Sequence, residues 1–224
     1  MDKSSVVMLA APQSPAAEAY RALRMNLAFT SLDKSLETFV VSSPAADANK
    51  SQVAMNLAVV MAQAGQRVIL VDADLRRPSL HACFGVAQEP GLTGFMLYQD
   101  GDAAVVLVDT EVAGLRFLPS GALPPNPADI LGSQKMEQLL TQLKAQADVV
   151  VLDAPPVTVA VDASVLAAQT DGLLLVVRAG HTRRDRIAQA QELLERFRVR
   201  LLGAVFTDAP EGGLLTGYRT ANGC

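Results

Sequence analysis

The chain of 224 residues has no tryptophan, and aromatic side chains make up only 4% of it. Its two cysteines, Cys83 and Cys224, are too few for a framework of disulfides, and they fit a reduced, cytoplasmic protein. Basic residues are not in excess either, because the formal net charge is −4. This charge balance argues against a surface built to bind nucleic acid.

Long apolar runs are also missing. Runs such as Leu57–Ala62 and Leu173–Val177 fall far short of the roughly 18 residues of a membrane-spanning helix, and the first residues do not form a signal peptide. Half of the residues (50%) are nevertheless hydrophobic, which excludes a mainly disordered chain. We therefore expect one large folded domain whose core is filled by Ala, Val and Leu.

Short apolar runs rich in β-branched residues alternate with longer stretches of helical spacing, a pattern typical of βα units. Because the short runs are apolar on both faces, we expect central strands in a mostly parallel sheet that helices cover on both sides. The predicted strands are Thr38–Ser42, Arg67–Asp72, Leu115–Pro119, Asp148–Asp153, Gly172–Arg178 and Leu201–Thr207. The predicted helices are Pro15–Thr30, Ser51–Ala64, Thr93–Tyr98, Pro127–Ala147, Asp162–Gln169 and Thr182–Phe197. The glycine-rich stretch 209–224 is expected to be a flexible tail after a single domain over 1–208.

The segment after the first predicted strand has the layout of a phosphate-binding loop, with a turn followed by a Lys-Ser pair at the start of a helix. In such loops the lysine reaches the terminal phosphates and the hydroxyl binds Mg²⁺, roles that fall to Lys50 and Ser51. Asp47 and Asn49 replace the usual glycines; both residue types tolerate the left-handed conformation, although Asp47 adds negative charge. Taken alone, an ordinary strand-to-helix turn with an exposed lysine explains this segment equally well.

Three aspartates follow predicted strands at the edge of the sheet where ligands bind in open parallel sheets. Asp72 and Asp74 end the second strand, and Asp153 ends the fourth. Spaced two residues apart, Asp72 and Asp74 are expected to point to the same side, where they could hold Mg²⁺ or accept a proton. Turn formation would explain any one of these aspartates, but not three of them beside a Lys-Ser turn. The pattern therefore predicts a nucleotide–Mg²⁺ site.

With these motifs the chain resembles the bacterial tyrosine kinases of capsule and exopolysaccharide biosynthesis, a branch of the ParA/MinD-like P-loop ATPases. The resemblance covers nearly the whole chain and depends on several motifs in the right order. Besides the loop, these motifs are Glu18–Arg24, Val71–Arg76, Pro125–Pro127, Asp153–Pro156 and Asp171–Thr182. It implies an α/β, three-layer P-loop NTPase fold with a mostly parallel central sheet, and a protein-tyrosine kinase that uses ATP and Mg²⁺.

The resemblance also implies roles for individual residues. Lys50 and Ser51 match the Walker A lysine and hydroxyl, and Asp153 matches the Walker B aspartate. Asp72 and Asp74 match the acidic pair of the family's second Walker motif, one of which helps to deprotonate the attacking tyrosine. The implied catalytic residues are Lys50, Asp72 and Asp74, and the implied Mg²⁺ ligands are Ser51, Asp72 and Asp153. The implied nucleotide-binding residues are Ala46, Asp47, Ala48, Asn49, Lys50, Ser51, Gln52 and Thr207.

Assembly and partners are implied in the same way. Glu18, Arg21 and Arg24 match the family's E-x-x-R-x-x-R oligomerisation motif, although a solvated helix face would also explain such a charged stripe. By resemblance the assembly is a homo-oligomeric ring, commonly of eight subunits, in which the tail of one subunit enters the site of its neighbour. A membrane-embedded activator of polysaccharide export is the expected partner, and it would recruit this cytoplasmic chain to the inner face of the membrane.

Three departures from the family pattern concern function. The loop glycines are replaced, Thr207 stands where the family has an adenine-reading asparagine, and the tail carries Tyr218 alone instead of a run of tyrosines. A threonine hydroxyl makes fewer hydrogen bonds than an asparagine amide. Two alternatives therefore stay open: a pseudokinase, impaired in nucleotide binding, that acts as an assembly or regulatory subunit, and a ParA/MinD-like ATPase that switches its oligomeric state.

Overall fold

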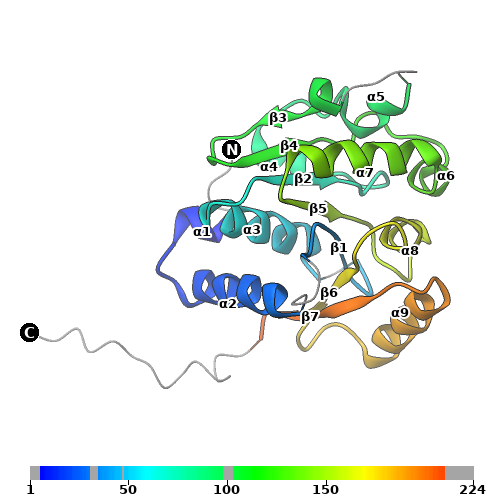
Figure 1. The fold of residues 1–224 in the computed structure, drawn as a ribbon. Helices are drawn as coiled ribbons and strands as arrows, with labels where there is room; N and C mark the ends of the chain where they lie inside the picture. Colours follow the sequence, from blue (N-terminus) through cyan, green and yellow to red (C-terminus); the bar gives the residue numbers. More distant parts are fainter. Residues whose placement is uncertain (1–5, 31–34, 47, 98–102, 210–224) are drawn as a thin grey trace, which may run out of the picture.

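The computed structural model describes residues 6–30, 35–46, 48–97 and 103–209, and these form a three-layer α/β fold (Figure 1). Its middle layer is a seven-stranded sheet in the order β3-β4-β2-β5-β1-β6-β7. Neighbouring strands are parallel except for β3 and β4, which confirms the predicted mostly parallel sheet. The strands are β1 (Thr38–Ser42), β2 (Val68–Asp72), β3 (Val108–Asp109), β4 (Leu115–Leu118), β5 (Val149–Asp153), β6 (Leu173–Arg178) and β7 (Leu201–Thr207).

Helices cover both faces of this sheet, and each face has its own hydrophobic core. On one face lie α1 (Val7–Ala10), α2 (Pro15–Phe29), α3 (Lys50–Gln63) and α4 (Leu80–Phe84). On the other lie α5 (Gly91–Leu97), the 3₁₀ helix η2 (Ala103–Val106), α6 (Pro127–Leu131), α7 (Gln134–Gln146), α8 (Asp162–Ala167) and α9 (Arg184–Arg196). All five residues of β1, of β2 and of β5 are buried, because alternate side chains of a strand enter the two cores.

The long helix predicted over Pro127–Ala147 is wrong, because the structure has two helices there. Gly132 lies so close to α8 that a Cβ atom at this position would be 2.9 Å from Val165 Cγ1. The Ser133 hydroxyl then accepts a hydrogen bond from the Met136 amide at 3.2 Å and caps α7 as a new helix. The apolar periodicity continues through the break, so it did not reveal this change of direction.

The expectation that Leu201–Thr207 is a central strand is also wrong. Among the described residues, β7 has a neighbouring strand on its β6 side alone, and its residues alternate between exposed and more buried. Leu201 and Phe206 are thus exposed at the edge of the sheet. The sequence prediction also omitted α1, α4, η2 and β3, which are two to five residues long and too short to show a period.

The helix predicted to precede the first strand is confirmed as α2. The Ser14 hydroxyl accepts a hydrogen bond from the Ala17 amide at 3.2 Å, and Pro15 occupies the first turn. The helix packs against α3, which follows the phosphate-binding loop. Within the described ranges, no helix combines the length and the apolarity that crossing a membrane requires.

Candidate active site

The loop between β1 and α3 leads directly into the first turn of α3, and its Asp47 lies outside the described residues. Asn49 lies in the left-handed region at φ 54°, which confirms that an asparagine takes the conformation for which the family uses glycine. The Asn49 side chain forms no capping hydrogen bond, so it does not cover the first N–H groups of α3. A helix start of this kind favours an anionic ligand such as a phosphate group.

Lys50 begins α3, and its ammonium group lies between two carboxylates. Its Nζ is 2.9 Å from Asp74 Oδ2 and 3.0 Å from Asp153 Oδ1, with only 12% of the side chain exposed. The Ser51 hydroxyl donates a short hydrogen bond to the other oxygen of Asp153. Burial lowers the pKa of Lys50, but the charges of Asp153 and Asp74 outweigh it and leave the pKa above its ordinary value. The lysine is therefore charged and held where a phosphate would compete with two aspartates for it.

Asp72 is paired with Asp153 in the register of β2 and β5, which brings the two carboxyl groups to the same edge of the sheet. Asp72 Oδ2 accepts hydrogen bonds of 3.1 Å from the amides of Ser79 and Leu80. Its other oxygen, Oδ1, is buried and has no hydrogen-bond partner among the described residues. Burial, together with the charge of Asp153, raises the pKa of Asp72 to about 8. Asp72 therefore keeps its proton to a higher pH than an exposed aspartate does.

The residues present fit a bound Mg²⁺ ion. Carboxylate and hydroxyl oxygens are the ligands that this ion prefers, and the unpartnered Oδ1 of Asp72 lies beside Asp153, whose carboxylate binds Ser51. Among the described residues, no group of three or more His, Cys, Asp or Glu could hold a metal alone. In P-loop sites, phosphate oxygens and water supply most of the Mg²⁺ ligands.

Two cavities meet at the first turn of α3, and both are lined by Asn49 and Gln52. The first, of about 380 Å³, is also lined by Ala46, Lys50 and Ser51, so five of the eight predicted nucleotide-binding residues line it, and Ala48 does not. The second, of about 480 Å³, lies between α2, α3 and the end of β7. Together the cavities offer one place for phosphates and an adjoining place for a nucleoside.

Thr207, the predicted base-contacting residue, lines the second cavity. Its hydroxyl is 3.4 Å from the carbonyl oxygen of Ala48, which is itself buried. Sequence reasoning missed Tyr20, which lines the same cavity from α2, and Arg77, which lines the first cavity beside Asp74. The position of Arg77 three residues after Asp74 is the one signal that could have pointed to it.

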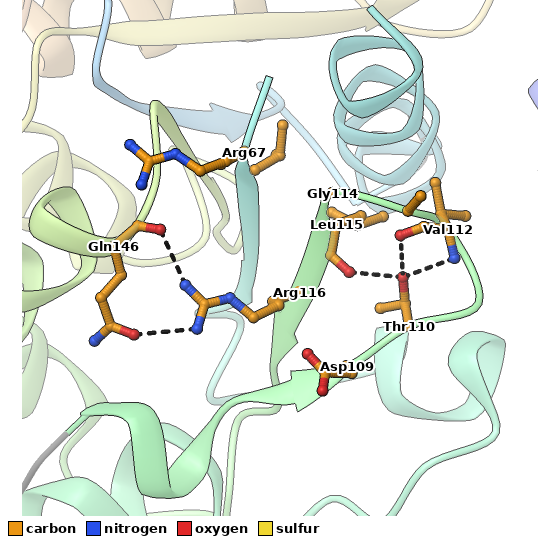
Figure 2. Close-up of a pocket in the computed structure, with 10 residues that line it drawn as sticks. Arg67, Asp109, Thr110, Val112, Gly114, Leu115, Arg116 and Gln146 are labelled. Atoms are coloured by element: carbon orange, nitrogen blue, oxygen red, sulfur yellow. Dashed lines mark hydrogen bonds between the residues drawn. The ribbon is translucent and has the colours of Figure 1, made fainter. Parts of the chain in front are cut away.

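A third cavity, of about 360 Å³, lies at the opposite edge of the sheet, near the amino ends of β2 and β4 (Figure 2). Its two arginines have structural roles. Arg116 donates to Gln146 Oε1 at 3.1 Å and to the Gln146 carbonyl at the end of α7 at 3.0 Å (Figure 2), while Arg67 pairs with Asp148 at 2.6 Å. This cavity also lies far from the aspartates at the carboxyl ends of the strands, so we do not assign it to the nucleotide.

Lys50, Ser51, Asp74 and Asp153 together are called the Lys50 cluster below. The predicted assembly residues lie on α2, outside this cluster. Arg21 Nη1 pairs with Glu18 Oε2 at 3.0 Å, and Arg21 Nη2 donates to the Pro12 carbonyl at 2.7 Å. Glu18 is exposed and Arg24 is half-buried, so part of the stripe faces outward. Tyr218, the predicted phosphorylation site, lies outside the described residues.

The fold and the Lys50 cluster define the chain as a P-loop NTPase. Comparison with known proteins agrees, because residues 36–207 match the ParA family, described as NUBPL iron-transfer P-loop NTPase. Over 201 residues the chain is 37% identical to the tyrosine-protein kinase YwqD of Bacillus subtilis, a match that covers 90% of this chain and 84% of YwqD. It is also 32% identical to the tyrosine-protein kinase Etk of Escherichia coli, of which it spans 27%.

Solved structures give the same result. The chimerical protein CapA2B2 superposes with a TM-score of 0.88 at 33% identity, covering 93% of this chain and 91% of CapA2B2. The kinase domain of Escherichia coli Etk superposes with a TM-score of 0.87 at 30% identity, covering 96% of this chain and 84% of that domain. The chain therefore belongs to the bacterial tyrosine-protein kinases, within the ParA family of P-loop NTPases.

Proposed function

We propose that the chain is an ATP- and Mg²⁺-dependent protein-tyrosine kinase that phosphorylates itself and acts in the synthesis or export of a surface polysaccharide. The observation that carries this proposal is the Lys50 ammonium, held 2.9 Å from Asp74 and 3.0 Å from Asp153 beside the open first turn of α3. Phosphoryl transfer needs little beyond positioning and charge neutralisation, and these groups supply both.

Each residue has a distinct role in this proposal. The N–H groups at the start of α3 and the Lys50 ammonium bind the phosphates of ATP and neutralise the charge that grows on the leaving oxygen. Asp74 accepts the proton of the attacking tyrosine phenol. The phenol oxygen bonds to the γ-phosphorus of ATP as the bond between that phosphorus and the ADP oxygen breaks. Ser51, Asp72 and Asp153 would hold Mg²⁺, which supplies further charge neutralisation when it is bound.

Assembly and partners complete the proposal. We infer a homo-oligomeric ring, commonly of eight subunits in this family, that Glu18, Arg21 and Arg24 help to form from α2. In such a ring the tail of one subunit, with Tyr218, would be the substrate of the next. A membrane-embedded activator of polysaccharide export would recruit the kinase to the inner face of the membrane.

Phosphotyrosine formation tests the proposal. Purified chain with ATP and Mg²⁺ should gain phosphate on tyrosine, and Tyr218→Phe should remove most of the signal from the tail. Tyr98→Phe is the matched control, because it removes a tyrosine hydroxyl outside the tail, and it should keep tail labelling. If wild-type chain takes up no phosphate, the kinase proposal is wrong, and the fold would serve an assembly or regulatory role instead. Labelling that Tyr218→Phe leaves unchanged would overturn the assignment of the tail as substrate.

A further inference from the structure

The loop after β2 is tied to the start of α8 by a two-pronged ion pair. Arg76 Nε donates to Asp162 Oδ2 at 2.7 Å, and Arg76 Nη2 donates to Asp162 Oδ1 at 3.0 Å. The Asp162 side chain is 0% exposed, whereas that of Arg76 is 42% exposed. A carboxylate so deeply buried needs a charged partner with this geometry. The ion pair therefore fixes the loop relative to α8.

The backbone at Arg76 also orients Asp74. Asp74 Oδ1 accepts hydrogen bonds from the amides of Arg76 at 3.3 Å and Arg77 at 3.0 Å. These bonds turn the other oxygen, Oδ2, toward Lys50 Nζ at 2.9 Å. Any movement of Arg76 would thus move the donors that aim Asp74 at the lysine.

The segment that leads to Asp162 is fastened to the phosphate-binding loop. The Ser42 hydroxyl donates to the Pro155 carbonyl at 2.7 Å, and the Val157 amide donates to the Ser43 carbonyl at 2.8 Å. The Thr158 hydroxyl donates to the Pro44 carbonyl at 2.6 Å. Residues 155–162 therefore join the loop that carries Lys50 to the ion pair that holds the loop with Asp74.

We propose that Arg76 is a positioning residue for Asp74: through its ion pair with Asp162 it holds the Asp74 carboxylate at Lys50. Arg76 is not among the residues that line the cavity beside Lys50, so it would act through Asp74 and not by touching ATP. The proposal rests on the proposed kinase function for its effect on rate. Its effect on the backbone of the loop can be measured without any catalysis.

Steady-state kinetics of the full chain, with ATP and a tyrosine-containing peptide, test the effect on rate. Arg76→Gln and Asp162→Asn should each lower kcat by about 10- to 100-fold and leave KM for ATP within about threefold, because the phosphates bind at Lys50 and α3. Arg76→Lys should recover part of the loss, since it keeps the charge but not the two-pronged geometry. The double variant should be no slower than either single variant. Arg183→Ala, which breaks an exposed ion pair at the start of α9, is the control and should match wild type.

Amide hydrogen exchange, followed by NMR, tests the position of the loop independently of activity. Asp162→Asn should speed exchange of the Arg77 amide by about threefold or more and leave the amides in the middle of α3 unchanged. Unchanged exchange at Arg77, or an equal increase throughout the chain, would overturn the proposal. So would an unchanged kcat in Arg76→Gln when wild type is active. If wild type is inactive but exchange at Arg77 responds as expected, the kinase proposal fails and the positioning of Asp74 stands.

Discussion

Replacing Asp72 by asparagine should change how the stability of the protein depends on pH. Asp72 has its ordinary pKa of 3.8 when unfolded and a pKa raised to about 8 in the folded chain by burial and by Asp153. Between these values the folded state binds the extra proton, so the free energy of unfolding of wild type falls as pH rises, by up to about 1.4 kcal/mol per pH unit. Asparagine does not titrate, and its amide oxygen can accept the hydrogen bonds from Ser79 and Leu80.

The free energy of unfolding of Asp72→Asn relative to wild type should therefore rise by about 3 kcal/mol from about pH 5 to about pH 7. Urea denaturation at both pH values measures this difference. Asp148→Asn is the control: Arg67 lowers the pKa of the exposed Asp148, so that group finishes titrating below this window and its variant should show no such rise. A difference for Asp72→Asn that stays constant, or falls, from about pH 5 to about pH 7 would refute the reasoning.

Two further predictions concern the loop and the assembly. Asn49→Gly should bind ATP at least as tightly as wild type. Asn49→Val should bind ATP more weakly, because a β-branched residue in the left-handed region costs about 1–2 kcal/mol. Equal ATP affinities of Asn49→Val and wild type in calorimetric titration would contradict this. Light scattering should show a large wild-type oligomer that Arg21→Ala with Arg24→Ala dissociates and Arg183→Ala does not. A wild-type monomer at high concentration would overturn the ring.

The fold could be predicted from the sequence where burial imposes a simple pattern. Val68–Asp72 and Val149–Asp153 are apolar runs because both of their faces are buried, and parallel order followed from the helices between them. The edge position of Leu201–Thr207 could not be predicted, because an apolar run has the same sequence pattern whether or not a further strand pairs with it on its outer side. The break at Gly132 depends on the approach of α8, which only the packed fold defines.

The candidate site was predictable in part. Parallel strands end at one edge of their sheet, and this rule alone predicted that Asp74 and Asp153 lie close to Lys50. The different partners of the two carboxylates could not be predicted: Asp72 Oδ2 binds the amides at the start of α4, while Asp74 contacts Lys50. The pair Arg76–Asp162 was missed because its members are 86 residues apart, in segments whose course depends on tertiary packing.

Calorimetric titration of the full chain with ATP and ADP, with and without Mg²⁺, tests most directly whether this loop holds a nucleotide. The account predicts micromolar binding that depends on Mg²⁺ and is lost in Lys50→Met, because Lys50 supplies the charge nearest to the phosphates. Absence of binding by wild type, or binding that Lys50→Met leaves unchanged, would contradict it. The Lys50 cluster would then be a structural ion-pair network and not a phosphate site.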